Sequence, residues 1–200
     1  MKRIMTAILA VTLLFAAVPA FAGETLARVL VVYFSRTGEN YSVGVIEEGN
    51  TAKMAKIIAD QTGADLFEIV PEVPYPDDYD SVLPIATREK NEDARPAYLG
   101  DIDNWDQYDT VFISYPIWWG EIPNIVYTFM EAYDFTGKTV IPFNTHEGSG
   151  QSHSQRDIEG LLTSATVLKG LAIRGSKAQN DAEGTSADVA AWLKNIGLAD

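Results

Sequence analysis

Short runs of apolar residues, mostly β-branched or aromatic, recur along the chain and predict buried strands. Arg28–Phe34 and Thr110–Tyr115 are almost uninterrupted runs of this kind, as a strand covered on both faces requires. Similar runs predict three further strands, over residues 65–70, 139–143 and 166–173. The pattern therefore predicts five strands.

Segments with apolar residues at helical spacing lie between these strands. Thr51–Gln61 is such a segment and stops before Gly63, a residue suited to end a helix. A helix over 122–132 carries Pro123 in its first turn, where a missing amide hydrogen costs nothing. The other predicted helices span residues 79–91, 155–163 and 185–196. This alternation is typical of βαβ units around a parallel sheet, so we expect an α/β fold.

The first residues of the chain have the pattern of a targeting segment. Lys2 and Arg3 precede an apolar run over Ile4–Val18, and Ala20-Phe21-Ala22 matches a signal-peptidase site. The apolar run is shorter than the roughly 20 residues that span a bilayer, although an uncleaved anchor is the alternative. We expect a signal peptide over residues 1–22, export to the periplasm, and one domain over residues 23–200.

Charge and cysteine content narrow the possible functions. The chain has 28 acidic and 15 basic residues, a net charge of −13. Loss of Lys2 and Arg3 with the signal peptide would leave 13 basic residues and a charge of −15. Such a charge repels nucleic acids and anionic membrane surfaces. The absence of cysteine excludes disulfides, thiolate metal sites and thiol nucleophiles.

In a parallel sheet, ligands bind beyond the carboxyl ends of the strands, where this chain has three unusual loops. The loop after the first strand carries Ser35, Arg36, Thr37 and Gly38, and the helix that follows opens with Asn50-Thr51. Hydroxyls and helix N-terminal amides suit a phosphate group. The alternative interpretation is that these polar residues only cap the helix that follows the loop and bind no phosphate.

Part of this loop resembles a nucleotide-binding motif but lacks its key residue. Gly44–Thr51 follows the spacing of a phosphate-binding loop, yet Asn50 stands in place of the lysine. Glu47 and Glu48 would also repel a triphosphate. We therefore expect no nucleoside triphosphate hydrolysis.

The loop after the third strand is rich in aromatic residues: Pro116, Ile117, Trp118, Trp119 and Gly120. Two tryptophans beside a glycine would form a flat apolar wall for a planar ring system. The alternative, packing into the core beneath the loop, suits one of the two tryptophans.

The loop after the fourth strand runs from Asn144 to Gly150 and includes Thr145. Gly148, Ser149 and Gly150 allow the backbone to approach a ligand, and their free amides could bond polar ring edges. Ser149 lacks the spacing of a catalytic serine. His146 and His153 lack accompanying ligands, so we expect no zinc site.

Together these loops resemble those of the flavodoxins. The resemblance extends from about Arg28 to the C-terminus. Its motifs are Val32–Gly38, Tyr115–Gly120, Tyr133–Thr139 and Gly148–Gly150. It implies a three-layer, doubly wound, five-stranded parallel sheet in the order 2-1-3-4-5, with FMN as cofactor.

The resemblance also implies roles for these loops. Ser35, Thr37, Gly38 and Thr51 would donate to the FMN phosphate, with Arg36 and Thr145 also in the site. The tryptophan loop and residues 148–150 would hold the isoalloxazine from two sides. One departure is an insertion over Glu39–Gly49, which we expect to loop out. Because of it, either Asn40 or Asn50 could contact the phosphate.

We therefore expect an exported FMN-binding electron carrier. Negative charge near a flavin disfavours its reduction, and an acidic face would steer redox proteins that have basic docking faces. One alternative is an NAD(P)H-dependent quinone or small-molecule reductase of the same fold. For that reductase, Arg36 and Arg156 are the only basic residues near the loops. A binding domain that has lost its flavin is the other alternative.

Overall fold

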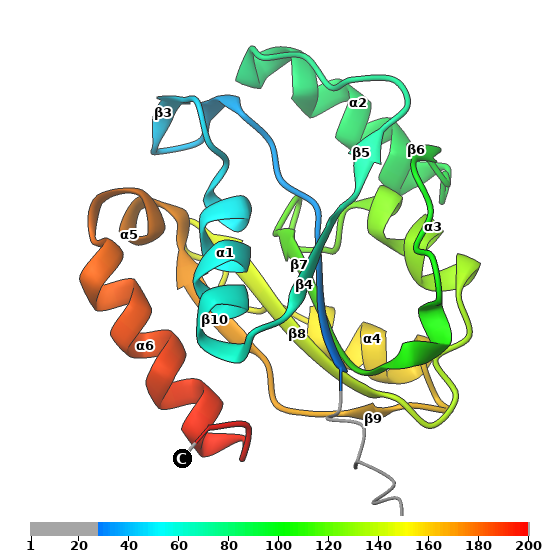
Figure 1. Cartoon of the computed structure of the whole chain (residues 1–200). Coiled ribbons are helices and arrows are strands. Elements are labelled where there is room, and N and C mark those ends of the chain that lie inside the picture. Colours follow the sequence, from blue (N-terminus) through cyan, green and yellow to red (C-terminus); the bar gives the residue numbers. More distant parts are fainter. Residues whose placement is uncertain (1–27, 200) are drawn as a thin grey trace, which may run out of the picture.

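A parallel sheet forms the centre of the protein in the computed structural model, which describes residues 28–199 (Figure 1). The predicted signal peptide, residues 1–22, lies outside the described residues. Four strands follow the predicted runs closely: β1 (Arg28–Tyr33), β4 (Asp65–Glu68), β7 (Tyr108–Pro116) and β8 (Thr139–His146). The last predicted strand is represented by β9 (Thr166–Val167) and β10 (Leu171–Arg174).

The order of the strands confirms the predicted topology. The sheet runs β10-β8-β7-β1-β4, with β9 paired to β8, and every pairing in it is parallel. Counted along the chain, with β9 and β10 as one interrupted strand, this is the order 2-1-3-4-5.

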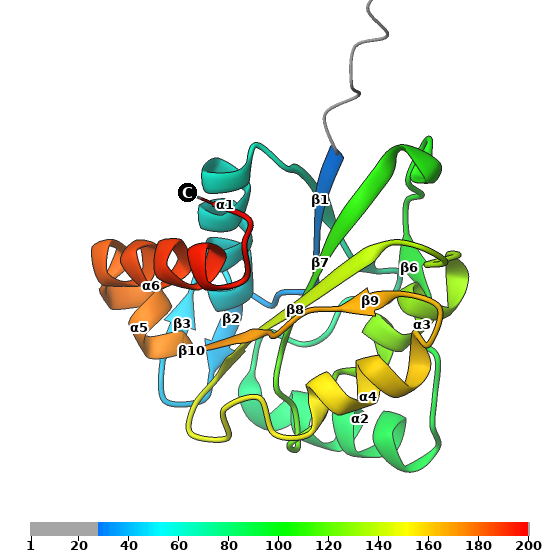
Figure 2. The same ribbon diagram turned by 90° about the horizontal axis from the view of Figure 1, so that it is seen from below.

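Helices cover both faces of the sheet, giving three layers (Figures 1 and 2). One face carries α1 (Asn50–Thr62), α5 (Gly175–Asn180) and α6 (Ala182–Asn195). The other carries α3 (Asn124–Ala132) and α4 (Ser154–Leu161), with a short 3₁₀ turn at Trp105–Gln107. A separate hydrophobic core fills each side, as a sheet buried on both faces requires.

Several boundaries differ from the sequence-based prediction. The helix predicted from residue 122 begins at Asn124, so Pro123 precedes it as the capping residue and does not stand in its first turn. Val70 leaves the sheet and, as part of β5 (Val70–Pro71), pairs with β6 (Tyr98–Leu99) instead. The final helical region, predicted as 185–196, begins earlier and is divided into α5 and α6. The strand β8 continues to His146, so Thr145 and His146 belong to a strand and not to the following loop.

The last strand, predicted as continuous over 166–173, is interrupted beside Pro142. This proline has no amide hydrogen to give to a strand ladder. At Gly170 the chain passes so close that an added Cβ would lie 2.6 Å from the Pro142 carbonyl oxygen. Pairing with β8 therefore stops after Val167 and resumes at Leu171.

The helix α2 (Tyr79–Asn91) lies beyond the carboxyl ends of the strands, at the top of Figure 1. Its start is capped by Asp78, whose carboxylate accepts a 2.8 Å hydrogen bond from the Ser81 amide. The buried side chains Val82 and Ala86 belong to neither main core cluster. The apolar face of α2 is therefore turned toward the space above the sheet, where a ligand site is expected.

Within residues 28–199, no helix combines the length and the apolar character that crossing a membrane requires.

Candidate functional site

A cavity of about 160 Å³ lies at the carboxyl edge of the sheet. Its walls come from the loop after β1, the start of α1, the helix α2, the loop after β7 and the end of β8. The predicted site residues that line it are Arg36, Asn40, Asn50, Pro116, Ile117, Trp118, Trp119 and Thr145.

One end of the cavity is formed where the loop after β1 meets the start of α1. Gly49 is buried against this loop: an added Cβ would lie 2.1 Å from Ser35 Oγ and 2.7 Å from the Arg36 carbonyl oxygen. Ser35 Oγ accepts a 3.0 Å hydrogen bond from the Ala52 amide and keeps its own proton for another acceptor. Gly49, the last residue of the insertion, thus lies against the loop that precedes the insertion.

Two side chains at the start of α1 differ in whether their polar atoms have hydrogen-bond partners. Thr51 shares a 2.8 Å hydrogen bond with Thr145 and links this end of the cavity to β8. Asn50 Oδ1 is buried and has no hydrogen-bond partner among the described residues. A buried polar atom without a hydrogen-bond partner destabilises the folded protein. Asn50 Oδ1 is therefore available to accept a hydrogen bond from a ligand.

The insertion is a short antiparallel hairpin, β2 (Gly38–Asn40) and β3 (Gly44–Ile46), and not an irregular loop. Asn40 Nδ2 donates to the carbonyl oxygens of Arg36 and Gly38, at 3.3 and 3.1 Å. The hairpin side chain Tyr41 packs against Tyr79 of α2, with the ring centroids 5.9 Å apart. The hairpin therefore forms a wall of the cavity together with α2.

Arg36 holds this hairpin to the segment before α2. Its guanidinium donates to the carbonyl oxygens of Pro76, at 2.8 Å, and Asp77, at 3.1 Å, and also to that of Glu39. Burial lowers the pKa of Arg36, and the neighbouring Asp77 carboxylate opposes this shift. Arg36 was predicted as a cofactor-binding residue, and it does line the cavity, but three backbone carbonyls engage its guanidinium.

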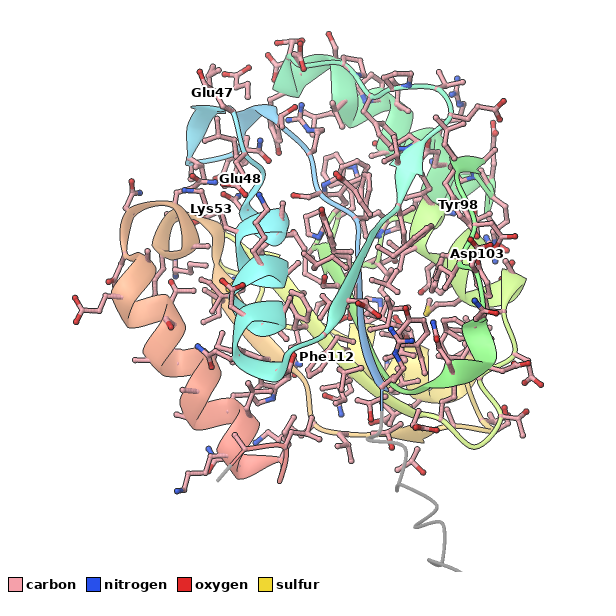
Figure 3. All side chains as sticks on the ribbon, in the orientation of Figure 1. Glu47, Glu48, Lys53, Tyr98, Asp103 and Phe112 are labelled. Carbon is pink, nitrogen blue, oxygen red and sulfur yellow. The ribbon has the colours of Figure 1, made fainter. Side chains whose placement is uncertain are left out.

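Thr37 and Gly38 lie on the outer side of the hairpin and line a neighbouring groove instead of the cavity. Acidic side chains line the same groove, among them Glu47 and Asp77. Glu47 and Glu48 follow β3 on the connection to α1, as Figure 3 shows. Negative charge therefore surrounds the hairpin end of the site.

The two tryptophans of the loop after β7 have different environments. Trp118 is partly buried and contacts Phe34 and Tyr75 edge to face, with centroid distances of 5.4 and 5.1 Å. Trp119 is 54% exposed at the cavity. The alternative interpretation, core packing for one of the two, therefore applies to Trp118, while Trp119 is free to cover a ligand.

Trp119 occupies a strained position in a tight turn. The turn is closed by two hydrogen bonds between the backbones of Trp118 and Glu121, at 3.0 and 2.9 Å. Trp119 and Gly120 both have positive φ values, 50° and 77°, as in a type I′ turn. This conformation costs a non-glycine residue about 1–2 kcal/mol. Strain combined with exposure is typical of a residue kept for binding.

The loop after β8 is folded around a histidine that our site prediction did not include. The amides of Gly148 and Gly150 donate to Nδ1 of His146, at 2.9 and 3.1 Å. Asn144 Nδ2 donates to the Gly150 carbonyl oxygen, at 3.0 Å. These two glycine amides are thus engaged within the loop, and Ser149 at its tip is exposed.

The helix α2 is the other part of the site that the sequence did not reveal. Its side chains Tyr79, Val82, Leu83 and Ala86 line the cavity. Their spacing predicts an amphipathic helix but not the surface that it covers. The described residues also contain no group of three or more potential metal ligands.

Comparisons with known proteins agree with this fold. The family model described as Flavodoxin matches residues 28–196. A crystal structure of a protein from Bacteroides eggerthii, provisionally described as a flavoprotein, is 32% identical. It has a TM-score of 0.69, with 85% of this chain and 98% of that chain covered. A similar protein from Bacteroides uniformis is 30% identical with a TM-score of 0.65, covering 84% and 98%.

A more distant similarity is to a flavoprotein from Lactobacillus acidophilus, crystallised in complex with FMN. It is 21% identical with a TM-score of 0.60, covering 76% of this chain and 97% of that chain. At this identity the likeness concerns the fold. No curated protein is significantly similar to the chain.

Proposed function

Because this chain belongs to the flavodoxin family, we propose that it binds FMN in the cavity and carries electrons between proteins outside the cytoplasm. The cavity itself carries this proposal. It lies at the carboxyl edge of the sheet and combines an exposed tryptophan at one side with a helix N-terminus at the other. FMN has the matching parts, a planar ring system and a phosphate. Bound FMN would supply the redox chemistry that the side chains lack.

The residues at the start of α1 fit a phosphate. Helix N-terminal amides and the Ser35 hydroxyl can donate there, and the position of Gly49 leaves no room for a side chain. The unsatisfied Asn50 Oδ1 can only accept, so it suits a hydroxyl group of FMN, while the Asn50 side-chain amide group is the part that could donate to the phosphate. Of the two candidate asparagines, we assign the ligand contact to Asn50. The Asn40 amide group already donates to two carbonyls within the hairpin.

Trp119 would cover one face of the isoalloxazine, while the apolar side of α2 would exclude water from the cavity. Trp118 also lines the cavity, and its contacts with Phe34 and Tyr75 would support the turn that presents Trp119. Lys90 of α2 also supports this turn, through a 2.9 Å ion pair with Glu121.

The hydrogen bonds of the Arg36 guanidinium favour an electron carrier over an NAD(P)H-dependent reductase. A dinucleotide cofactor would add further phosphates to the site, and arginine and lysine side chains bind phosphates most strongly. Arg36 is the only arginine or lysine among the residues that line the cavity, and three carbonyls engage it. Arg156, the other candidate, lies exposed on α4 and is not among those residues.

The negative charge suits a carrier that meets basic partner proteins. Glu147 lines the cavity, and acidic side chains line the groove beside the hairpin. A negative environment disfavours the additional electron density of a reduced flavin, so we expect a low reduction potential. It would also steer partners with basic docking faces, in an interaction that weakens as salt increases.

Absorbance spectroscopy of the purified protein with added FMN tests cofactor binding directly. We expect a protein-bound flavin spectrum that survives gel filtration, and a colourless protein would favour the flavin-free alternative. The bound form is then assayed with NADPH and a quinone. We expect negligible turnover until a partner reductase is added, and rapid turnover without one would contradict the carrier proposal.

Export is a separate part of the proposal and rests on the sequence of residues 1–22. The full-length chain, expressed in a Gram-negative host, should appear in the periplasmic fraction with Gly23 as its first residue. N-terminal sequencing of that fraction provides the measurement. A protein that keeps Met1 and stays in the cytoplasm would contradict export.

A further inference from the structure

The shape of the loop after β8 depends on one imidazole nitrogen. Nδ1 of His146 accepts hydrogen bonds from both the Gly148 and Gly150 amides, at 2.9 and 3.1 Å. Gly148 and Gly150 have positive φ values, 125° and 62°. A change at this nitrogen therefore affects the whole turn.

The two hydrogen bonds define the protonation state of His146. An imidazole nitrogen that accepts a hydrogen bond must be unprotonated, so the ring is neutral and carries its proton on Nε2. A second proton, on Nδ1, would turn this nitrogen into a donor that faces the two donating glycine amides. Both hydrogen bonds would be lost, and the glycine amides would turn away.

The ring also belongs to the cavity. His146 lines it together with its neighbours Thr145 and Glu147. The glycine loop and the cavity therefore share one side chain, and the shape of the loop is coupled to the site through the charge of that side chain.

We propose that His146 is a positioning residue of the flavin site, which keeps the Gly148–Gly150 loop in its binding-competent shape only while the imidazole is neutral. The effect on flavin affinity rests on the proposed function, whereas the effect on the loop does not. Acidification is expected to open the loop and weaken flavin binding.

The groups around His146 favour its neutral form. Burial lowers its pKa below the ordinary value of 6.5, and the positive charge of Arg174 lowers it further, while Glu147 opposes both effects. Arg174 stands beside His146 in the pairing of β10 with β8. The titratable side chains elsewhere in the cavity lining are Arg36, Tyr41 and Tyr79.

The sign of the pH effect follows from this lowered pKa. The folded protein holds the proton of His146 less tightly than the unfolded chain does. The stabilisation of the loop is therefore complete above pH 6.5. It is lost as the pH falls through the lower pKa of the folded state.

Nuclear magnetic resonance of the apoprotein tests the loop without any flavin. As His146 is titrated, the amide resonances of Gly148 and Gly150 should shift together, with the midpoint of the imidazole. Amides that stay unchanged while His146 becomes protonated would overturn the proposal.

Flavin affinity provides the second test, using His146→Asn and the matched variant His153→Asn. Asparagine can place Oδ1 where Nδ1 stood and accept the same hydrogen bonds, but it does not titrate. Riboflavin is used as the ligand because the phosphate group of FMN has a second pKa of about 6. Its own titration would therefore overlap with the effect of His146. The riboflavin affinity of the wild type and of His153→Asn should fall about tenfold between pH 8 and pH 5, equivalent to about 1.4 kcal/mol.

For His146→Asn the riboflavin affinity should remain nearly constant over this range. An equal pH dependence in the wild type and in His146→Asn would overturn the inference while leaving the proposed function intact. If neither riboflavin nor FMN binds at any pH, the proposed function fails, and the glycine resonances still decide the role of His146.

Discussion

Replacing Gly49 by alanine is expected to weaken FMN binding about 100-fold, equivalent to about 3 kcal/mol. The new Cβ would lie 2.1 Å from Ser35 Oγ and 2.7 Å from the Arg36 carbonyl oxygen, so the loop after β1 must move. This movement breaks the hydrogen bond from the Ala52 amide to Ser35. It also displaces the donors that would hold the phosphate, and each charge-assisted hydrogen bond contributes about 1.5–3 kcal/mol. Fluorescence titration of the apoprotein with FMN gives the affinity.

A comparison of riboflavin with FMN shows which part of the site the Gly49→Ala substitution disturbs. Riboflavin has no phosphate, so its affinity should fall much less than that of FMN. Overpacking of the buried position should also lower the free energy of unfolding by about 1–3 kcal/mol, measured by urea denaturation. A Gly49→Ala protein that binds FMN like the wild type would show that this region does not hold the phosphate.

Gly160→Ala is the matched control for this substitution. Gly160 lies in α4, it is exposed, and an added Cβ would meet nothing within 4 Å. Alanine is a better helix former than glycine by about 1 kcal/mol. This variant should therefore be slightly more stable than the wild type, with unchanged FMN affinity.

Replacing Trp119 by asparagine should separate binding from stability, because the two should change in opposite directions. Stacking of an aromatic side chain on a flat ring contributes about 1–3 kcal/mol, so FMN affinity should fall about tenfold or more. Asparagine adopts positive φ values more readily than tryptophan. The free energy of unfolding should therefore rise by about 0.5–1 kcal/mol, as strain at the turn is relieved.

Trp118→Ala is the matching variant in the same turn. Trp118 packs against Phe34 and Tyr75 and is partly buried. Its loss should destabilise the protein by about 3 kcal/mol, within the range for aromatic truncations. Flavin affinity and urea denaturation, measured on both variants, distinguish the two roles. A Trp119→Asn variant that is less stable but keeps its FMN affinity would assign Trp119 a structural role.

The sheet was predictable because it depends on local patterns. In the run Arg28–Phe34, the side chains from Leu30 onward are buried on both faces of the sheet. A chain with this pattern has few other ways to remove these apolar side chains from water. The alternation of strands and helices then limits the connections to parallel crossovers. The residues at the carboxyl edge could be named in advance for the same reason.

Details that depend on pairing between distant residues were not predictable. The break between β9 and β10 depends on Pro142 in the neighbouring strand. The hairpin over the insertion is held by Arg36 and by the segment before α2, about 40 residues further along the chain. Neither interaction leaves a periodic signal in the sequence.

The sequence by itself thus determined the strands and the edge of the sheet where the site lies, and its resemblance to the flavodoxins implied the strand order. It also supplied a phosphate-suited loop, two tryptophans and a glycine loop at that edge. Only the tertiary structure decided which tryptophan is exposed, that Asn50 is left unsatisfied, and that His146 anchors the glycine loop. The physical reason is that hydrophobic periodicity is a property of neighbours in the chain. Exposure and hydrogen bonding depend on what the rest of the fold brings to the same place.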